Sequence, residues 1–278
     1  MRVPHPSRVA AGRGEAWRWA RGPRGYTREV SLATGDLTID TRADDLAPDS
    51  APHAPRAIWA LVPAYQEGER VAGVVVGALP HMPVLVVDDG SSDDTADRAE
   101  AAGAIVLRQR PNQGKGAAVR AGFRWALEEG LEAVVILDAD GQHDPAELPT
   151  FLRAFAERRA DLVIGRRDFS RMPLVRRISN TVGRWAFSWA VGRSVPDNQS
   201  GYRLLSRRLM ERLVDAEESG FEFDVEMITV CIRSGFRLDW VPIRTIYAGE
   251  GSHIRPVEHL RGFVRVVRRA RREVREPR

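Results

Sequence analysis

Two aspartates separated by one residue follow an apolar run in the middle of the chain. Asp138 and Asp140 come directly after Val-Val-Ile-Leu at 134–137, a run typical of a strand buried on both faces. In open α/β sheets the ligand crevice lies at the carboxyl ends of the strands. Neighbouring carboxylates repel each other unless a cation neutralises them, and with the amide of Gln142 they suit Mg²⁺ or Mn²⁺. A solvated turn is the commoner origin of Asp-x-Asp, so the context must decide.

Polar residues also follow the three other strands that we expect at this edge: Tyr65 and Glu67 after 58–62, Asp88 and Asp89 after 84–87, and Arg166 after 161–164. Carboxylates suit the donor groups of a base or ribose as well as a metal, and arginines suit phosphate oxygens. The constellation predicts a metal-nucleotide site.

The elements that position these residues alternate between strands and helices. We predict a further strand over 104–107, and helices over 70–78, 117–129, 145–157, 206–214 and from 221, with short strands over 238–241 and 243–247. Such alternation indicates βαβ units and a mainly parallel sheet in an α/β fold. Gly114-Lys115-Gly116 lacks the spacing of a P-loop, and no G-x-G-x-x-G follows the first strand, which argues against a dinucleotide-binding site.

Composition narrows the function classes further. The 278 residues carry a net charge of only +4, so the overall charge does not call for nucleic acid as a partner. The single cysteine, Cys231, excludes an internal disulfide framework, and we place it in the core. Without a signal peptide or a spanning apolar run, we expect a cytoplasmic protein, free or bound peripherally to the cytoplasmic membrane face.

Three segments stand apart from the alternating pattern. Residues 1–55 are rich in Arg, Pro, Gly and Asp without periodicity, which predicts a disordered extension. Residues 173–192 place Trp185 and Trp189 beside arginines, a pattern that suits either a membrane interface or an ordinary core-packed helix. Residues 251–278 are arginine-rich and predict a basic amphipathic helix from 257, which favours an anionic membrane surface over a merely solvated helix end.

Seven motifs in order resemble the inverting GT-A glycosyltransferases of family 2, and within them the dolichyl- or polyprenyl-phosphate mannose or glucose synthases. The motifs are VPAYQE, VVDDGSSDDT, NQGKGAAVRAG, ILDADGQHDP, the Arg166-Arg167 pair, DNQSGYR and FEFDVEM. The resemblance implies a GT-A domain over 56–250 that transfers a hexose from a nucleotide sugar to a lipid phosphate. No transmembrane helices follow that domain, unlike in membrane-anchored relatives.

The resemblance also assigns roles to residues. It implies that the nucleoside is held by Pro63, Tyr65, Glu67, Asp88 and Asp89, with Lys115 near the nucleotide. It implies that the divalent cation is bound by Asp138, Asp140 and Gln142, and that the acceptor phosphate is received by Arg166, Arg176 or Arg177, and Ser179.

The acceptor decides what acid–base chemistry is needed. A lipid monophosphate is already ionised and needs positioning more than a base. A hydroxyl acceptor, as in soluble members that modify small molecules or proteins, requires a carboxylate base, for which Asp197 and Glu226 are the candidates. His143 has no metal-ligand spacing to another histidine, so we interpret it as a structural residue or as one that supports the metal ligands from behind.

Two rival function classes share part of this pattern. A nucleotidyltransferase has the same layout but would carry a Gly-rich signature after the first strand. A non-catalytic membrane-surface protein would be expected to have lost a metal carboxylate. If the protein is a glycosyltransferase, Asp88 and Asp89 do not identify the nucleobase of the donor, because guanine and uracil both present N–H groups that a carboxylate can accept. Of the possible donors, we favour GDP-mannose or UDP-glucose.

Overall fold

The computed structural model describes residues 7–11, 14–18, 58–168, 174–216, 222–244, 267–272 and 274, with the backbone alone at 7–11, 14–18, 174–180 and 222. The chain divides into two units, residues 1–57 and 58–278. In the first unit, β1 (Ser7–Ala11) and β2 (Gly14–Arg18) pair antiparallel. We did not expect this hairpin. The disorder predicted for residues 1–55 as a whole stays a prediction.

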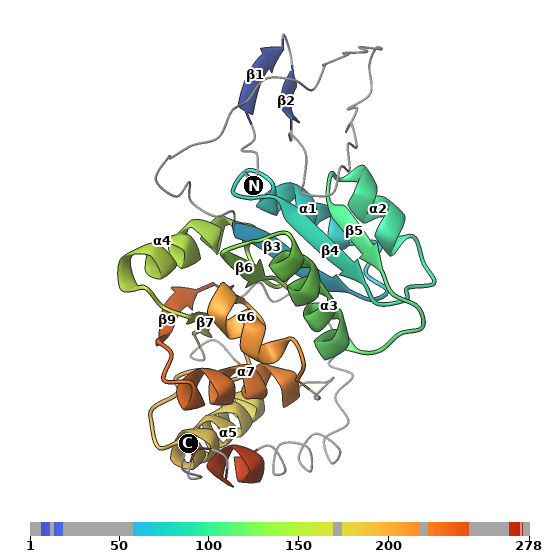
Figure 1. The fold of residues 1–278 in the computed structure, drawn as a ribbon. Coiled ribbons are helices and arrows are strands. Elements are labelled where there is room, and N and C mark those ends of the chain that lie inside the picture. Colours follow the sequence, from blue (N-terminus) through green and yellow to red (C-terminus); the bar gives the residue numbers. More distant parts are fainter. Residues whose placement is uncertain are drawn as a thin grey trace. The chain divides into compact units, whose positions relative to one another are not determined.

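The second unit is an α/β domain built on one seven-stranded sheet (Figure 1). Its strands, in the spatial order of the sheet, are β5 (Ile105–Arg108), β4 (Val84–Asp88), β3 (Ile58–Ala64), β6 (Ala133–Ile136), β8 (Arg203–Ser206), β7 (Leu162–Arg167) and β9 (Leu238–Ile243). Only β8 runs antiparallel to its neighbours β6 and β7. The predicted mainly parallel sheet is confirmed.

Helices cover both faces of this sheet (Figure 1). The helices of the domain are α1 (Val71–Ala78), α2 (Thr95–Ala101), α3 (Lys115–Glu128), the 3-10 turn η1 (Pro145–Glu147), α4 (Leu148–Arg158), α5 (Leu174–Val191), α6 (Arg207–Leu213) and α7 (Glu222–Arg233), with a helical segment at 267–272.

Strand alternation divides the core between the two faces. Ala60 and Val62 of β3 pack with the buried residues of α1 and α4, whereas Leu61 points to the opposite face. There the methyl groups of Leu61 approach so closely that a Cβ at Gly122 of α3 would lie 2.3 Å from one of them. Glycine therefore allows α3 to pack tightly on the sheet. The predicted core position of Cys231 is confirmed, and burial raises the pKa of its thiol to about 12.

Three elements of the structure differ from the prediction. The strand β8 was not predicted, because its four residues follow a polar, turn-like motif and lead straight into α6. The two short strands expected after 238 form one strand, β9, up to Ile243, and residues 245–250 lie outside the described part. The helix predicted over 145–157 begins as a 3-10 turn, with Asp144 accepting a hydrogen bond from the Ala146 N–H.

Asp161, just before β7, ties three segments together at the amino end of the strands. Its buried carboxylate accepts hydrogen bonds from Ser206 Oγ at 2.9 Å, from the Arg208 guanidinium at 2.8 Å and from the Arg237 N–H at 3.0 Å. These contacts fix the starts of β7, α6 and β9 relative to one another.

We expect Asp161→Ala to lower the free energy of unfolding by about 2–4 kcal/mol, because it leaves buried donors without an acceptor. The exposed Asp215→Ala is the control and should stay within about 0.5 kcal/mol of the wild type. Urea denaturation followed by circular dichroism measures both, and equal midpoints would contradict the structural role of Asp161.

Candidate active site

The predicted site residues meet at the carboxyl edge of the sheet. The strands β3, β4, β6 and β7 all end there, and the antiparallel β8 begins there. The loop before β8, residues 197–202, therefore reaches the same edge as the aspartates after β6. The motif DNQSGYR, which is distant in sequence, therefore lies next to Asp138.

Lys115 and Asp138 form the central ion pair of this edge. Lys115 Nζ lies 2.5 Å from Asp138 Oδ1, and both side chains are partly exposed, at 39% and 26%. Burial alone would raise the pKa of Asp138, but Lys115 and then His143 lower it to about 2. Burial would lower the pKa of Lys115, but Asp138 and Asp224 raise it. The buried His143 accepts a hydrogen bond from the Asp138 N–H at 3.1 Å, consistent with a structural role.

Asp140 lies in an acidic environment that Lys115 offsets only in part. Its pKa is raised, chiefly by burial and then by the charge of Asp138, with Glu67 adding to the effect. Its Oδ1 accepts the Gln142 N–H at 2.9 Å. A divalent cation would relieve this repulsion, so the donor set fits one. The described residues hold no group of three or more His, Cys, Asp or Glu side chains arranged for a metal, so further ligands would come from Gln142 and from substrate phosphates.

Asp88 and Asp89 are both buried and organise the loop beside β4. Asp89 accepts the N–H groups of Gln113 at 2.9 Å and of Gly114 at 2.7 Å, and thereby fixes the start of α3, where Lys115 stands. Asp88 accepts the Ser91 N–H at 3.1 Å. Asp89 thus has a positioning role that the sequence did not reveal, and the nucleoside-binding role of both residues stays a prediction.

The remaining nucleoside candidates lie at the end of β3. Pro63 is buried within the strand, whereas Tyr65 is 49% exposed. Glu67 accepts a hydrogen bond from the Arg70 guanidinium at 3.0 Å. An exposed aromatic ring beside acidic groups suits a stacked base, so the geometry is compatible with the prediction.

Of the acceptor-side candidates, the structure describes the side chain of Arg166 alone. Arg166 is exposed at the end of β7. Arg176, Arg177 and Ser179 lie in the first turns of α5, where the backbone alone is described. Their roles stay predictions.

The two carboxylates considered as general bases are held by arginines. Asp197, 1% exposed, pairs with Arg167 through two bonds of 2.8 and 3.0 Å, and it also accepts the Gln199 N–H. Glu226 lies 3.6 Å from the Arg269 guanidinium. An acceptor hydroxyl would therefore have to compete with an arginine for the oxygens of either carboxylate.

Comparison with known proteins agrees with this geometry. Residues 59–214 match the profile of the family described as "Glycosyl transferase family 2". This span contains the Lys115–Asp138 ion pair and the loop before β8. The chain belongs to glycosyl transferase family 2.

Relatives within the family share much of the chain. An undecaprenyl-phosphate mannosyltransferase of Micrococcus luteus is 37% identical over 204 residues, covering 67% of this chain and 82% of that protein. A polyprenol monophosphomannose synthase of Mycolicibacterium smegmatis is 32% identical over 203 residues, covering 66% and 75%. The predicted family is confirmed.

A solved structure confirms the GT-A type of α/β fold. Glucosyl-3-phosphoglycerate synthase from Mycobacterium tuberculosis, determined with Mn²⁺, UDP and phosphoglyceric acid, matches with a TM-score of 0.61 and covers 80% of each chain. At 20% sequence identity this match concerns the fold alone.

Sequence reasoning missed the role of Arg203 in this family 2 site. Its guanidinium is fully buried and donates to the carbonyl oxygens of Ser200 at 2.7 Å, of Asn198 at 3.2 Å and of Asp224. It thereby joins the loop before β8 to the start of α7. Only its place in the motif DNQSGYR marked it, and a motif does not reveal which carbonyl groups a guanidinium will bind.

Gly201 is the point where that loop touches the ion pair. A Cβ at this position would lie 2.5 Å from Asp138 Oδ2 and 3.0 Å from Lys115 Nζ. Both contacted atoms are ends of side chains, so a substitution would displace the ion pair before it disturbed the backbone. Glycine here preserves the position of the Asp138 carboxylate.

We expect Gly201→Ala to lower the rate of sugar transfer by about tenfold to a hundredfold, because small displacements of reacting groups are costly. Its urea midpoint should remain near that of the wild type. The control is Gly73→Ala on α1, where an added Cβ meets nothing within 4 Å. Equal rates for Gly201→Ala and Gly73→Ala would show that the close approach has no functional role.

Proposed function

We propose that this protein transfers a hexose, with inversion, from a nucleotide sugar to a polyprenyl phosphate, assisted by Mg²⁺ or Mn²⁺. The names of the two bacterial relatives, which are mannosyltransferases of polyprenyl phosphates, support this acceptor class. The donor, GDP-mannose or UDP-glucose, stays a prediction.

One observation carries the choice of a phosphate acceptor over a hydroxyl. Both carboxylates that we considered as bases are paired with arginines, Asp197 with Arg167 and Glu226 with Arg269. A hydroxyl acceptor requires a base that takes its proton, whereas a phosphate monoester attacks as an anion. The arrangement therefore suits an acceptor that arrives already ionised, and Arg166 is exposed at the same edge to receive its charge.

The donor side follows from charge as well. When bound, a divalent cation would stabilise the negative charge that gathers on the leaving nucleoside diphosphate. Asp138, Asp140 and Gln142 would hold it. Lys115, fixed by the loop that Asp89 organises, holds Asp138 in its ionised form. In this proposal it would also meet a phosphate oxygen of the donor.

We expect Asp140→Asn to reduce turnover by about two to three orders of magnitude, the scale of a lost electrostatic contact to developing charge. The assay follows transfer from GDP-mannose or UDP-glucose to a polyprenyl phosphate with Mg²⁺ or Mn²⁺. Excess chelator should abolish wild-type transfer, and the exposed Asp215→Asn should retain it. Full activity of Asp140→Asn or of chelated wild type would remove the metal assignment.

We also propose that the protein attaches peripherally to the anionic cytoplasmic membrane face. Among the described residues, no helix is both long and apolar enough to cross a bilayer. On α5, three large side chains one turn apart are exposed: Val182 at 59%, Trp185 at 71% and Trp189 at 58%. Arg271 of the C-terminal segment lies 3.3 Å from the centre of the Trp189 ring. Apolar and basic groups thus share one surface, as interfacial binding requires.

We expect Trp185→Ala to weaken binding to anionic vesicles by about tenfold or more, because an exposed large side chain loses its burial in the interface. Ile105→Ala, which removes an exposed apolar side chain from the edge strand β5, is the matched control. Sedimentation with anionic and neutral vesicles at low and high salt measures both variants. Equal recovery in the supernatant with both vesicle types would contradict membrane attachment.

A further inference from the structure

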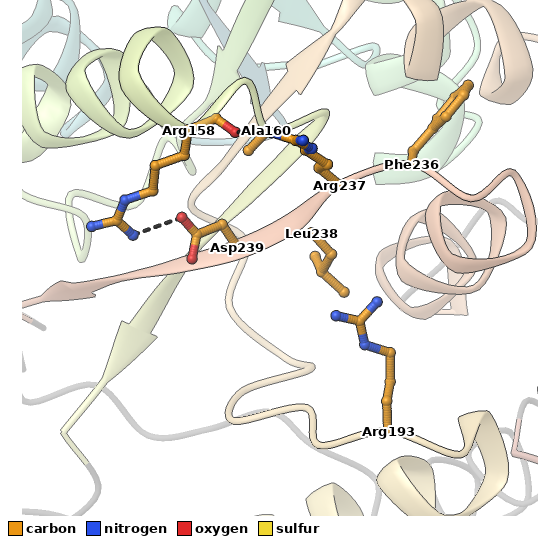
Figure 2. A pocket seen from close by; sticks show the side chains of 7 residues that line it. All are labelled: Arg158, Ala160, Arg193, Phe236, Arg237, Leu238 and Asp239. Atoms are coloured by element: carbon orange, nitrogen blue, oxygen red, sulfur yellow. Dashed lines mark hydrogen bonds and ion pairs between the residues drawn. The ribbon is translucent and has the colours of Figure 1, made fainter.

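A basic hollow lies at the amino ends of the strands, whereas the candidate active site lies at their carboxyl ends. A hollow of about 320 Å³ is lined by Arg158, Ala160, Arg193, Phe236, Arg237, Leu238 and Asp239 (Figure 2). Residue 160 precedes β7 and Leu238 begins β9, so the hollow is at the amino ends of these parallel strands. The metal-binding candidates are at the carboxyl ends, and the two sites share no residue.

Its lining carries three guanidinium groups and one carboxylate. Arg158 is neutralised by Asp239, at 2.6 Å. The Arg237 guanidinium donates to a backbone oxygen, the carbonyl of Arg158, at 3.2 Å. Within the described part of the chain, the Arg193 guanidinium has neither a hydrogen bond nor an ion pair, and Figure 2 shows it directed toward Leu238. Among these described residues, two positive charges in the hollow are therefore left without an anion.

The chemistry of this lining selects a phosphate group. Guanidinium groups are planar donors whose geometry matches phosphate oxygens. Arg193 and Arg237 both line the hollow. Ala160 and Leu238 add an apolar wall, which suits a phosphate that carries a carbon skeleton. A metal cation would be repelled by the excess positive charge.

We propose that this hollow is a non-catalytic phosphate-binding site, occupied by a phospholipid head group or by a soluble phosphate monoester. The lipid source rests on the proposed membrane attachment. Helix α5 has 18 residues and begins seven residues after β7 ends at the active-site edge. It spans about 27 Å, and Arg193 follows its last residue by two. The exposed Trp189 stands four residues before Arg193, so a bilayer that contacts Trp189 would lie near the hollow.

Two binding experiments on the full chain separate these sources. The first is calorimetric titration with glycerol 3-phosphate, with glycerol as the blank. The second is flotation with phosphatidylcholine vesicles that contain or lack phosphatidic acid. Each compares the wild type with Arg193→Gln, with the double variant Arg193→Gln/Arg237→Gln, and with Arg212→Gln, an exposed arginine on α6 outside the hollow.

We expect each substitution in the hollow to weaken phosphate binding by about fivefold, the effect of one basic residue near an anionic group. A loss in the titration identifies a soluble phosphate compound, and a loss in flotation alone identifies a lipid head group. If both hollow variants bind as Arg212→Gln does in both experiments, the site does not exist. Arg193→Gln removes no side-chain hydrogen bond within the described chain, so a folding defect cannot imitate this result.

The outcome is independent of the proposed function. Neither binding experiment contains a nucleotide sugar, and transfer to a short polyprenyl phosphate in detergent should be unchanged in both hollow variants. Absence of transfer by the wild type would count against the glycosyltransferase proposal and leave the phosphate site standing.

Discussion

The ion pair between Lys115 and Asp138 joins the two halves of the site. Lys115 stands at the start of α3, held there by Asp89 through the backbone of the preceding loop. Asp138 follows β6 and carries the second carboxylate, Asp140, two residues later. The pair settles which aspartate is strongly ionised: the pKa of Asp138 is lowered to about 2, whereas that of Asp140 is raised. Asp138 is thus already balanced by a cation of the protein, whereas Asp140 keeps an acidic surrounding that a bound cation would relieve.

The loop before β8 contacts the same ion pair. Gly201 brings this loop into contact with Asp138, and Arg203 holds the loop by its carbonyl oxygens. Arg203 also binds the Asp224 carbonyl, so α7 is fixed to the same point. Burying a guanidinium is costly unless its donors are satisfied, and here backbone oxygens satisfy them. The buried guanidinium of Arg203, which belongs to β8, thus links that strand to the preceding loop and to the start of α7.

Much of the domain could be predicted because its signals are local. Apolar runs followed by Gly and Asp mark the parallel strands, and periodicity marks the helices between them. The strand β8 could not be predicted, because four apolar and polar residues next to a helix start carry no periodicity of their own. The engagement of Asp197 by Arg167 was also hidden, since both residues stand in motifs that suggest function and only the folded sheet brings them together. The hydrogen bonds that Asp89 accepts from two backbone N–H groups were hidden for the same reason, and its contact with the nucleoside stays a prediction.

The antiparallel strand has a consequence for how the chain is organised. Ile164 of β7 and Arg203, the first residue of β8, are partners across the ladder. The segment that leaves β7 after Arg167, runs through α5 and returns at Gly201 is therefore a closed excursion, because the strands at its two ends are neighbours in the sheet. The length or the sequence of this connecting segment can change while the pairing of β7 with β8 stays the same. The predicted acceptor residues Arg176, Arg177 and Ser179 lie inside this segment, whereas the predicted nucleoside-binding residues between β3 and α3 lie outside it. Under the proposed function, a change of acceptor would therefore require changes in one continuous segment of the chain.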